Sequence, residues 1–236
     1  MKTIKIYLIR HGLFQGGSED RYIGQTDVPL TREGREQLKN MAEDYGYPQA
    51  DVVISSPLKR CLETAEIIYP GKEPIILQGL AEYDFGAFEG RTAAELMAKE
   101  DFVEWLKGGE DAGARDGETN GEFKKRICDT FVALVEGVME ANVNSAAVIT
   151  HGGVIMALMQ FFAFPEAPMS EWLTPCGCGY MLNLTPVIWS QLNKLEAVAE
   201  VPEMRRADDS EIYYGESAWE DYDSTFPGED EVIDLN

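Results

Sequence analysis

The sequence predicts an α/β protein with three layers, α/β/α, around a mostly parallel sheet of about six strands. Short β-branched apolar runs alternate with longer stretches of helical periodicity along most of the chain. Strands and helices that alternate in this way form parallel sheets with helices on both faces. With 236 residues, 44% of them hydrophobic, the chain can form one such domain with a buried core. We place this domain at residues 1–202 and a C-terminal extension at 203–236.

The strands are predicted from short apolar segments that end at polar or turn residues. The first covers residues 4–9 and ends at Arg10. The last two are separated by a predicted turn near residues 186–193. In chain order the predicted strands are 4–9, 52–54, 75–77, 146–150, 179–185 and 194–201.

Helix starts are predicted where a capping side chain precedes a run of helical periodicity. Ser56 is such a residue, and Pro57 after it suits the first helical position. Two Thr residues that are followed three positions later by Glu form capping boxes. The predicted helices are 32–45 after Thr31, 57 to about 69 after Ser56, one after Thr92, 120 to about 141 after Thr119, and 154–162.

The charge of the chain is strongly negative, with 42 acidic and 20 basic residues and a net charge of −22. Residues 207–236 hold eleven acids and neither Lys nor Arg. Such a surface repels the phosphate backbone, so we expect no nucleic-acid partner. The extension also contains aromatic residues. It is therefore interpreted either as a solvated tail or as a segment that docks on the domain or on a second subunit, which leaves a homodimer open.

The chain shows no membrane-spanning run of about 18 apolar residues and no secretory signal at its start, so we expect no membrane partner. Its four cysteines are too scattered for a disulfide framework, and we interpret them as free thiols in the cytoplasm. Cys176 and Cys178 lack the spacing of a zinc motif and a second pair. We therefore expect no metal and no other cofactor.

Candidate functional residues follow the predicted strands directly. The first strand leads into Arg10 and His11, the second into a segment that reaches Arg60, the third toward Glu82, and the fourth into His151. In open parallel sheets the functional groups collect beyond the carboxyl ends of the strands. We therefore expect these five side chains to converge at one edge of the sheet.

Two imidazoles, two guanidinium groups and one carboxyl suit phosphoryl transfer. A neutral imidazole is a competent nucleophile near pH 7. Arginine forks match the charge that develops on the phosphoryl oxygens, and a helix N-terminus at Ser56 would add amide donors. A second imidazole, if protonated, adds another donor, and a carboxyl of raised pKa protonates the leaving alkoxide. A single His beside Gly is more often structural, but four such groups at successive strand exits favour chemistry.

The sequence resembles the histidine phosphatase superfamily, the phosphoglycerate mutase-like group with the Arg-His-Gly signature. The resemblance spans residues 4 to about 185 in six ordered segments: 9–12, 22–31, 55–68, 82–90, 117–119 and 150–155. It implies a mostly parallel six-stranded α/β/α fold. It further implies that His11 is the nucleophile, that Glu82 is the proton donor, and that Arg10, Arg60 and His151 hold phosphate.

One segment departs from the family pattern. The signature is commonly followed by Glu or Gln, then by Thr or Ser, and by an Asn three positions further on. This chain has Leu13 and Phe14, and Gly17 stands in place of the Asn unless Gln15 or Ser18 substitutes for it. We interpret Leu13 and Phe14 as packing residues, with a substrate-facing apolar wall as the alternative.

The predicted reaction is hydrolysis of a small phosphomonoester, such as α-ribazole phosphate or a sugar phosphate, because Glu82 runs directly into a short segment without the insertion of the mutases. The alternatives are mutase-type phosphoryl transfer and a non-catalytic binding protein that uses the acidic extension. Trp105, Lys107 and Arg115 are within the candidate substrate-facing segment, but we favour exposed helix or loop positions for them.

Overall fold

The computed structural model describes residues 3–17 and 21–203 of the chain. Except for Glu203, the predicted extension lies outside the described residues, as does Ser18. None of the helices in the described part of the chain is both long and apolar enough to cross a membrane.

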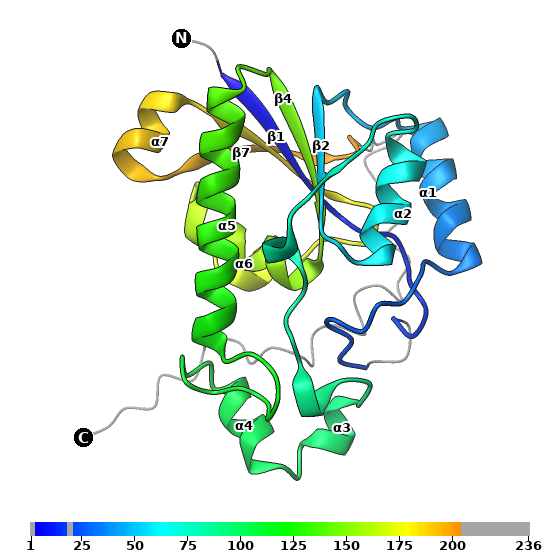
Figure 1. Ribbon diagram of the computed structural model, residues 1–236, viewed down its shortest axis with the longest axis vertical. Coiled ribbons are helices and arrows are strands. Elements are labelled where there is room, and N and C mark those ends of the chain that lie inside the picture. Colours follow the sequence, from blue (N-terminus) through cyan, green and yellow to red (C-terminus); the bar gives the residue numbers. More distant parts are fainter. Residues whose placement is uncertain (1–2, 18–20, 204–236) are drawn as a thin grey trace, which may run out of the picture.

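Seven strands form one sheet in the order β3-β2-β4-β1-β6-β7-β5 (Figure 1). β6 runs antiparallel to β1 and β7, and the other four neighbouring pairs are parallel. The predicted mostly parallel α/β sheet is confirmed, with one strand more than expected because a two-residue strand, β5, joins the edge. The strands are β1 Ile4–Arg10, β2 Val52–Ser55, β3 Ile75–Ile76, β4 Ser145–Thr150, β5 Ala163–Phe164, β6 Gly179–Leu184 and β7 Leu195–Val201.

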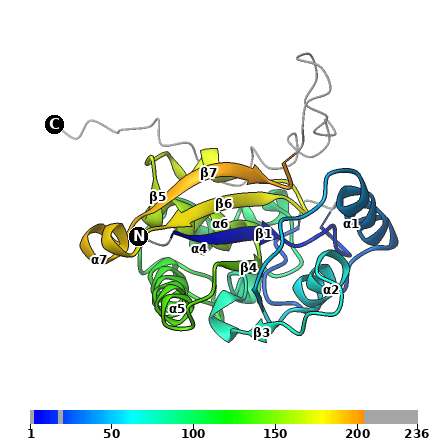
Figure 2. The same cartoon turned by 90° about the horizontal axis from the view of Figure 1, so that it is seen from above.

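Helices cover both faces of the sheet (Figure 2). The alternation of side chains along β1 explains the two layers, since Tyr7 and Ile9 pack on the side of α1 and α2, while Ile6 and Leu8 pack on the side of α5 and α6. The helices are α1 Arg32–Asp44, α2 Lys59–Ile68, α3 Ala93–Leu96, α4 Glu100–Leu106, α5 Asn120–Glu140, α6 Gly152–Phe162 and α7 Pro186–Leu192, with 3-10 turns η1 Gln78–Leu80, η2 Gly86–Phe88 and η3 Met169–Trp172.

The predicted N-caps are confirmed at three of the four helix starts named. The Thr31 side chain accepts a hydrogen bond from Gly34 N. Thr92 and Thr119 both form complete capping boxes, with Glu95 and Glu122 respectively. These bonds satisfy backbone N–H groups that the first turn of a helix leaves without an intrahelical partner.

The prediction for Ser56 is wrong. α2 begins at Lys59, after Leu58 as N-cap, so neither Ser56 nor Pro57 opens the helix. The Ser56 hydroxyl lies 2.7 Å from Nε2 of His151. It is therefore engaged with the imidazole, and the helix N-terminus expected at this residue is not present there.

Residues 186–192, predicted as part of a turn, form helix α7 between the two antiparallel strands. Pro186 lies in the first turn of this helix, where its missing N–H costs nothing. Asn193 ends it in the left-handed conformation, with φ of 51°. The connection is a helix because its apolar Trp189 is buried against the α5–α6 side of the core.

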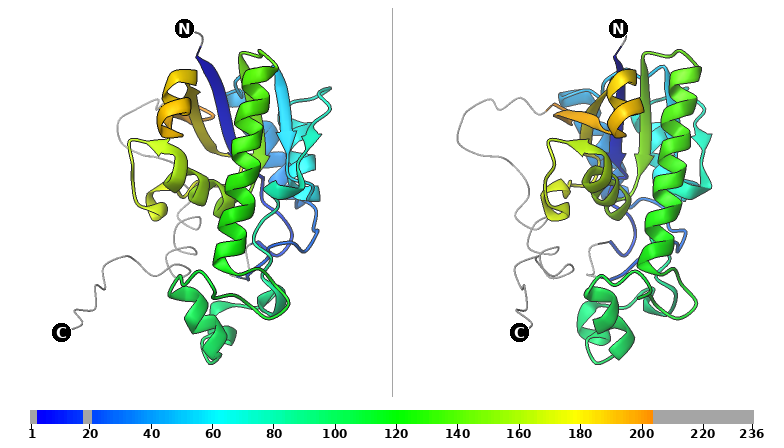
Figure 3. Two further views of the ribbon diagram at one scale, coloured as in Figure 1. Left: turned by 60° about the vertical axis from the view of Figure 1, so that its left-hand side comes forward. Right: turned by 90° about the vertical axis from the view of Figure 1, so that its left-hand side faces the viewer.

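α3 and α4 project beyond the sheet edge at which β1, β2 and β4 end (Figures 1 and 3). They are held by an aromatic cluster in which ring centroids lie 4.9–6.1 Å apart. Its members are Tyr22, Tyr83, Phe85, Phe88, Phe102, Trp105 and Phe123. Trp105 is only 5% exposed, so the expected surface position was wrong. Lys107 and Arg115 form exposed ion pairs, as expected.

Candidate active site

The predicted catalytic groups converge at the carboxyl ends of three neighbouring parallel strands, β1, β2 and β4. His11 follows β1 and His151 follows β4, and these strands pair in register from Lys5↔Ser145 to Arg10↔Thr150. The two imidazole rings therefore lie with their centroids 5.1 Å apart. Residues that are 140 positions apart in the sequence thus form one cluster.

His11 is buried and held in one tautomer. Its Nδ1 lies 2.8 Å from the carbonyl oxygen of Gly12. Because a carbonyl only accepts, Nδ1 carries the hydrogen and Nε2 keeps its lone pair. Burial, followed by the charges of Arg60 and Arg10, holds the pKa of His11 well below its ordinary value. The ring is therefore neutral at pH 7, which is the form that acts as a nucleophile.

Arg60 on α2 is completely buried and is directed by backbone carbonyls. Its Nη2 donates to Gly24 O at 2.5 Å, and its Nη1 donates to Thr26 O at 3.0 Å. Its Nε donates to Nδ1 of His151 at 3.3 Å. A guanidinium group has five N–H donors, so two remain for a ligand after these three bonds to described residues.

The loop that supplies these carbonyls is itself held by Glu89, which follows η2. The Glu89 carboxylate accepts from the N–H groups of Gly24 and Gln25 at 2.8–3.2 Å and from the hydroxyl of Thr26 at 2.9 Å. A side chain at Gly24 would meet Tyr83 O at 1.8 Å, so only glycine fits there. Sequence reasoning missed this role of Glu89, although the residue lies in one of the segments that carry the family resemblance.

His151 is fully buried and neutral in the structure. Its Nδ1 accepts from Arg60, so its Nε2 carries the hydrogen and donates it to the Ser56 hydroxyl. Burial, and then the electrostatic interactions with Arg60, His11, Arg10 and Arg126, hold its pKa well below the ordinary value. The sequence suggested an additional donor from a protonated ring, whereas this ring accepts a hydrogen bond and orients Arg60.

Glu82 reaches the cluster from the segment between η1 and η2. Its two carboxyl oxygens accept from the N–H groups of Gly153 at 3.1 Å and Tyr83 at 3.0 Å. A Cβ at Gly153 would lie 2.8 Å from a Glu82 oxygen, so glycine permits this approach. Burial raises the pKa of Glu82, and it outweighs the two backbone hydrogen bonds and the Arg60 and Arg10 charges, which lower it. A carboxyl of raised pKa is suited to donate a proton.

Arg10 is oriented by the loop before β6. Its Nη1 donates to Thr174 O at 2.7 Å, and Gly177 N donates to the carbonyl oxygens of Arg10 and His11. Gly177 has φ of 81°, a conformation that glycine adopts without strain. The sequence placed Arg10 at the site but did not indicate this supporting loop.

Phe14 packs directly against His11 and Arg60, which agrees with its interpretation as a packing residue. Its ring lies edge-on to the His11 ring with centroids 5.0 Å apart, and the Arg60 guanidinium carbon lies 4.9 Å from its centroid. Such contacts between a cation and an aromatic ring contribute about 0.5–2 kcal/mol. Gln15, in contrast, is exposed, and its backbone N–H donates to Pro29 O.

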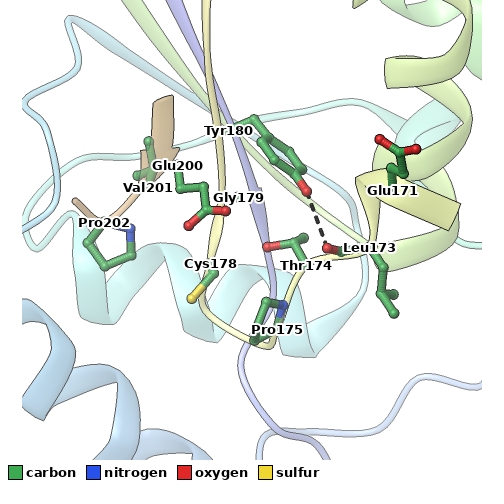
Figure 4. Close-up of a pocket in the computed structure, with 10 residues that line it drawn as sticks. All are labelled: Glu171, Leu173, Thr174, Pro175, Cys178, Gly179, Tyr180, Glu200, Val201 and Pro202. Carbon is green, nitrogen blue, oxygen red and sulfur yellow. Dashed lines mark hydrogen bonds between the residues drawn. The ribbon is translucent and has the colours of Figure 1, made fainter. Parts of the chain in front are cut away.

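A cavity of about 100 Å³ lies behind the loop that supports Arg10 (Figure 4). Its lining includes the carboxylates Glu171 and Glu200 together with Thr174 and Tyr180. Tyr180 donates from its hydroxyl to Leu173 O across the wall of this cavity. Two carboxylates repel an anion. The cavity is therefore unsuited to phosphate.

Comparison with known proteins agrees with this geometry. The model of the histidine phosphatase superfamily (branch 1) matches residues 6–180. The chain belongs to the histidine phosphatase superfamily. Among curated relatives, the adenosylcobalamin/alpha-ribazole phosphatase of Escherichia coli K12 is 28% identical over 186 residues, covering 77% of this chain and 90% of that protein. A probable phosphoglycerate mutase GpmB of Enterobacter sp. strain 638 is 35% identical over 155 residues, covering 63% of this chain and 70% of that protein.

Solved structures confirm the fold of this superfamily member. A putative alpha-ribazole-5'-P phosphatase from Escherichia coli K-12 superposes with a TM-score of 0.70 at 24% identity, covering 83% of this chain and 95% of that one. The alpha-ribazole phosphatase of Shigella flexneri gives a TM-score of 0.68 at 25% identity, covering 78% of this chain and 92% of that one. The phosphatase class predicted from the sequence is supported by the family match and by curated relatives that are named phosphatases.

Proposed function

We propose that this superfamily member hydrolyses small phosphomonoesters through a phosphohistidine on His11, without a metal. The observation that carries the proposal is the tautomer of His11. Its Nδ1–H is bonded to Gly12 O, which leaves the Nε2 lone pair for attack on phosphorus. Arg10 and Arg60 next to this ring supply positive charge for the phosphoryl oxygens.

In the first half-reaction, Nε2 of His11 attacks phosphorus and the ester P–O bond breaks. The Glu82 carboxyl gives its proton to the leaving oxygen, so an alcohol departs and Glu82 becomes a carboxylate. The raised pKa of Glu82 keeps a fraction of it protonated for this step. The arginines neutralise the charge that develops on the transferred phosphoryl group.

In the second half-reaction, the Glu82 carboxylate takes a proton from water, and the resulting hydroxide attacks phosphorus. The P–N bond to His11 breaks, orthophosphate leaves, and Glu82 is protonated again. We propose that His151 holds Arg60 in the resting site. When a phosphate dianion binds beside it, the negative charge raises the pKa of His151 and favours protonation of Nδ1, which gives up the hydrogen bond from Arg60 and becomes a donor to phosphate.

The experiment that tests the proposal is a rapid-quench measurement with a ³²P-labelled phosphomonoester. We expect acid-labile phosphate on wild-type protein and none on His11→Ala, together with turnover of p-nitrophenyl phosphate that is insensitive to EDTA. Glu36→Gln, which changes an exposed residue of α1, serves as the control and is expected to trap the same amount of label. Full turnover by His11→Ala would disprove the assignment of the nucleophile.

The substrate class is proposed from the named relatives. A screen of phosphorylated metabolites that includes α-ribazole phosphate, phosphoserine and sugar phosphates tests it, because relatives bear the names alpha-ribazole phosphatase and phosphoserine phosphatase. We expect at least one of them to be hydrolysed with a kcat/KM well above that of p-nitrophenyl phosphate.

Mutase-type transfer is the second candidate, since one relative at 35% identity is named a probable phosphoglycerate mutase. In that reaction the phosphohistidine returns its phosphoryl group to a bound sugar acid instead of to water. Interconversion of 2- and 3-phosphoglycerate that depends on added 2,3-bisphosphoglycerate would support it. Release of orthophosphate from the same substrates supports hydrolysis.

A further inference from the structure

Arg126, on α5, donates three hydrogen bonds to the segment that carries Glu82 and two to the carboxylate of Glu118. Its Nη1 donates to the carbonyl oxygens of Gly79 at 2.9 Å and Ala81 at 2.8 Å, and its Nη2 donates to the carbonyl oxygen of Glu82 at 3.2 Å. Its Nε and Nη2 also donate to Glu118, at 2.5 and 2.7 Å. The five N–H groups of one guanidinium are thus fully engaged, three of them with backbone carbonyls.

Glu118 binds the backbone on the other side of Glu82. Besides pairing with Arg126, its Oε2 accepts from the backbone N–H of Asp84 at 3.0 Å. The two side chains are 23% and 16% exposed, so water screens the pair only partly. The ion pair therefore fixes the backbone at Glu82 itself and on both flanks of it.

The position of this backbone decides where the Glu82 carboxyl points. Its oxygens already accept hydrogen bonds from Tyr83 N, which belongs to the segment that Arg126 and Glu118 hold, and from Gly153 N, which belongs to α6. A shift of the segment relative to α6 would break one of these bonds and move the carboxyl relative to His11. Misplacement of a reacting group by about 1 Å costs on the order of 10²-fold in rate.

We infer that Arg126 and Glu118 are positioning residues, which hold the Glu82 carboxyl at the distance from the leaving oxygen that proton transfer requires. The inference rests on the proposed role of Glu82 as proton donor. A merely structural ion pair would affect every substrate alike. A positioning pair affects most strongly those substrates whose leaving group needs a proton.

The test compares two substrates that differ in this need, p-nitrophenyl phosphate with a good leaving group and a simple alkyl phosphate with a poor one. In Arg126→Lys, three donors replace five and the fork geometry is lost. We expect kcat for the alkyl phosphate to fall on the order of 10²-fold and kcat for the aryl phosphate to fall less than about fivefold. Glu118→Gln is expected to show the same selectivity. Lys125→Met, which removes an exposed ion pair with Asp129 on the same helix, should leave both rates unchanged.

Glu82→Gln and the double variant Glu82→Gln/Arg126→Lys distinguish a failure of the positioning inference from a failure of the proton-donor assignment. We expect the double variant to lose no more alkyl phosphate turnover than Glu82→Gln alone, because the two residues act on one step. If Glu82→Gln shows the selective loss but neither Arg126→Lys nor Glu118→Gln does, the positioning inference is wrong and the proposed function stands. If Glu82→Gln itself lowers both rates equally, the proton-donor assignment is wrong, and the inference is wrong with it.

Discussion

The ring of Phe14 occupies the space into which any side chain at Gly17 would extend. A Cβ built on Gly17 lies 2.8 Å from a ring carbon of Phe14 and 3.0 Å from two others. The two departures from the family pattern, an aromatic residue at one position and a glycine three residues later, are therefore coupled by packing. The ring in turn contacts His11 and Arg60.

Gly17→Ala is expected to destabilise the protein by about 1–3 kcal/mol, since the added methyl group must displace a ring that is already packed. The measurement is the free energy of unfolding in urea. Gly137→Ala is the control, because a Cβ at this helical glycine meets no atom within 4 Å. That change is expected to stabilise α5 by roughly 0.5–1 kcal/mol. When Phe14 is already replaced by Ala, Gly17→Ala should no longer destabilise the protein. If the double variant Phe14→Ala/Gly17→Ala loses the sum of the free energies that the two single variants lose, the coupling is contradicted.

Glu89→Gln is expected to weaken phosphate binding through Arg60. The change removes the charge from the hydrogen bonds to Gly24, Gln25 and Thr26, each worth about 1.5–3 kcal/mol when charge-assisted. If about half of the free energy of one such bond, roughly 0.75–1.5 kcal/mol, is lost from phosphate binding at the guanidinium, KM and the inhibition constant for inorganic phosphate rise about three- to twelvefold. Glu104→Gln, at an exposed residue of α4, is the matched control. Equal effects of the two changes on KM and on the inhibition constant would contradict an action of Glu89 through Arg60.

The turnover of an alkyl phosphate is expected to fall as the pH rises through the raised pKa of Glu82. Only the protonated carboxyl donates to the leaving oxygen, and burial keeps that form present above the ordinary carboxyl pKa. In a plot of log kcat against pH, kcat should therefore decrease at alkaline pH with the slope expected for the loss of one proton. This decrease is called the alkaline limb. The limb should disappear in Glu82→Gln and be weaker for p-nitrophenyl phosphate; an unchanged limb in the variant would assign it to another group.

The stability of the protein is expected to decrease as the pH falls below about 6.5. The pKa values of His11 and His151 are lower in the folded state than in the unfolded chain. The unfolded state therefore binds more protons below 6.5, and acid favours unfolding by up to about 1.4 kcal/mol per pH unit for each ring. Glu82 acts in the opposite direction, since its folded pKa is raised and its contribution is lost as the pH rises above the ordinary value.

Urea unfolding at pH 5.0 to 7.5 measures this slope. His11→Asn and His151→Asn should each remove about half of it, because asparagine does not titrate. A slope that both variants retain in full would show that other groups dominate the acid sensitivity.

The convergence of His11, Arg60 and His151 was predictable because strand exits are visible as apolar runs that end in polar residues, and parallel neighbours share one edge. The contacts that hold these residues in place were not predictable from the sequence. Arg126 and Glu89 bind backbone groups that are distant in the sequence, and no local spacing marks such partners. The start of α2 was misplaced for the same reason, since the strongest hydrogen bond of the Ser56 hydroxyl, at 2.7 Å, is to an imidazole 95 residues away, and its contact with the N–H of Leu58, the N-cap of α2, is longer at 3.4 Å.

β1 lies at the centre of the sheet, so it is enclosed only after both of its neighbouring strands have been synthesised. Every proposed catalytic residue precedes position 152, yet β1 pairs with Ser145–Thr150 on one side and with Gly179–Leu184 on the other. The proposed nucleophile, His11, is thus synthesised early, and more than 170 further residues follow before both neighbours of its strand are complete. Contacts of such long range slow folding. A fragment that ends just after His151 would contain the whole proposed chemistry and still leave one edge of β1 open to association with other chains.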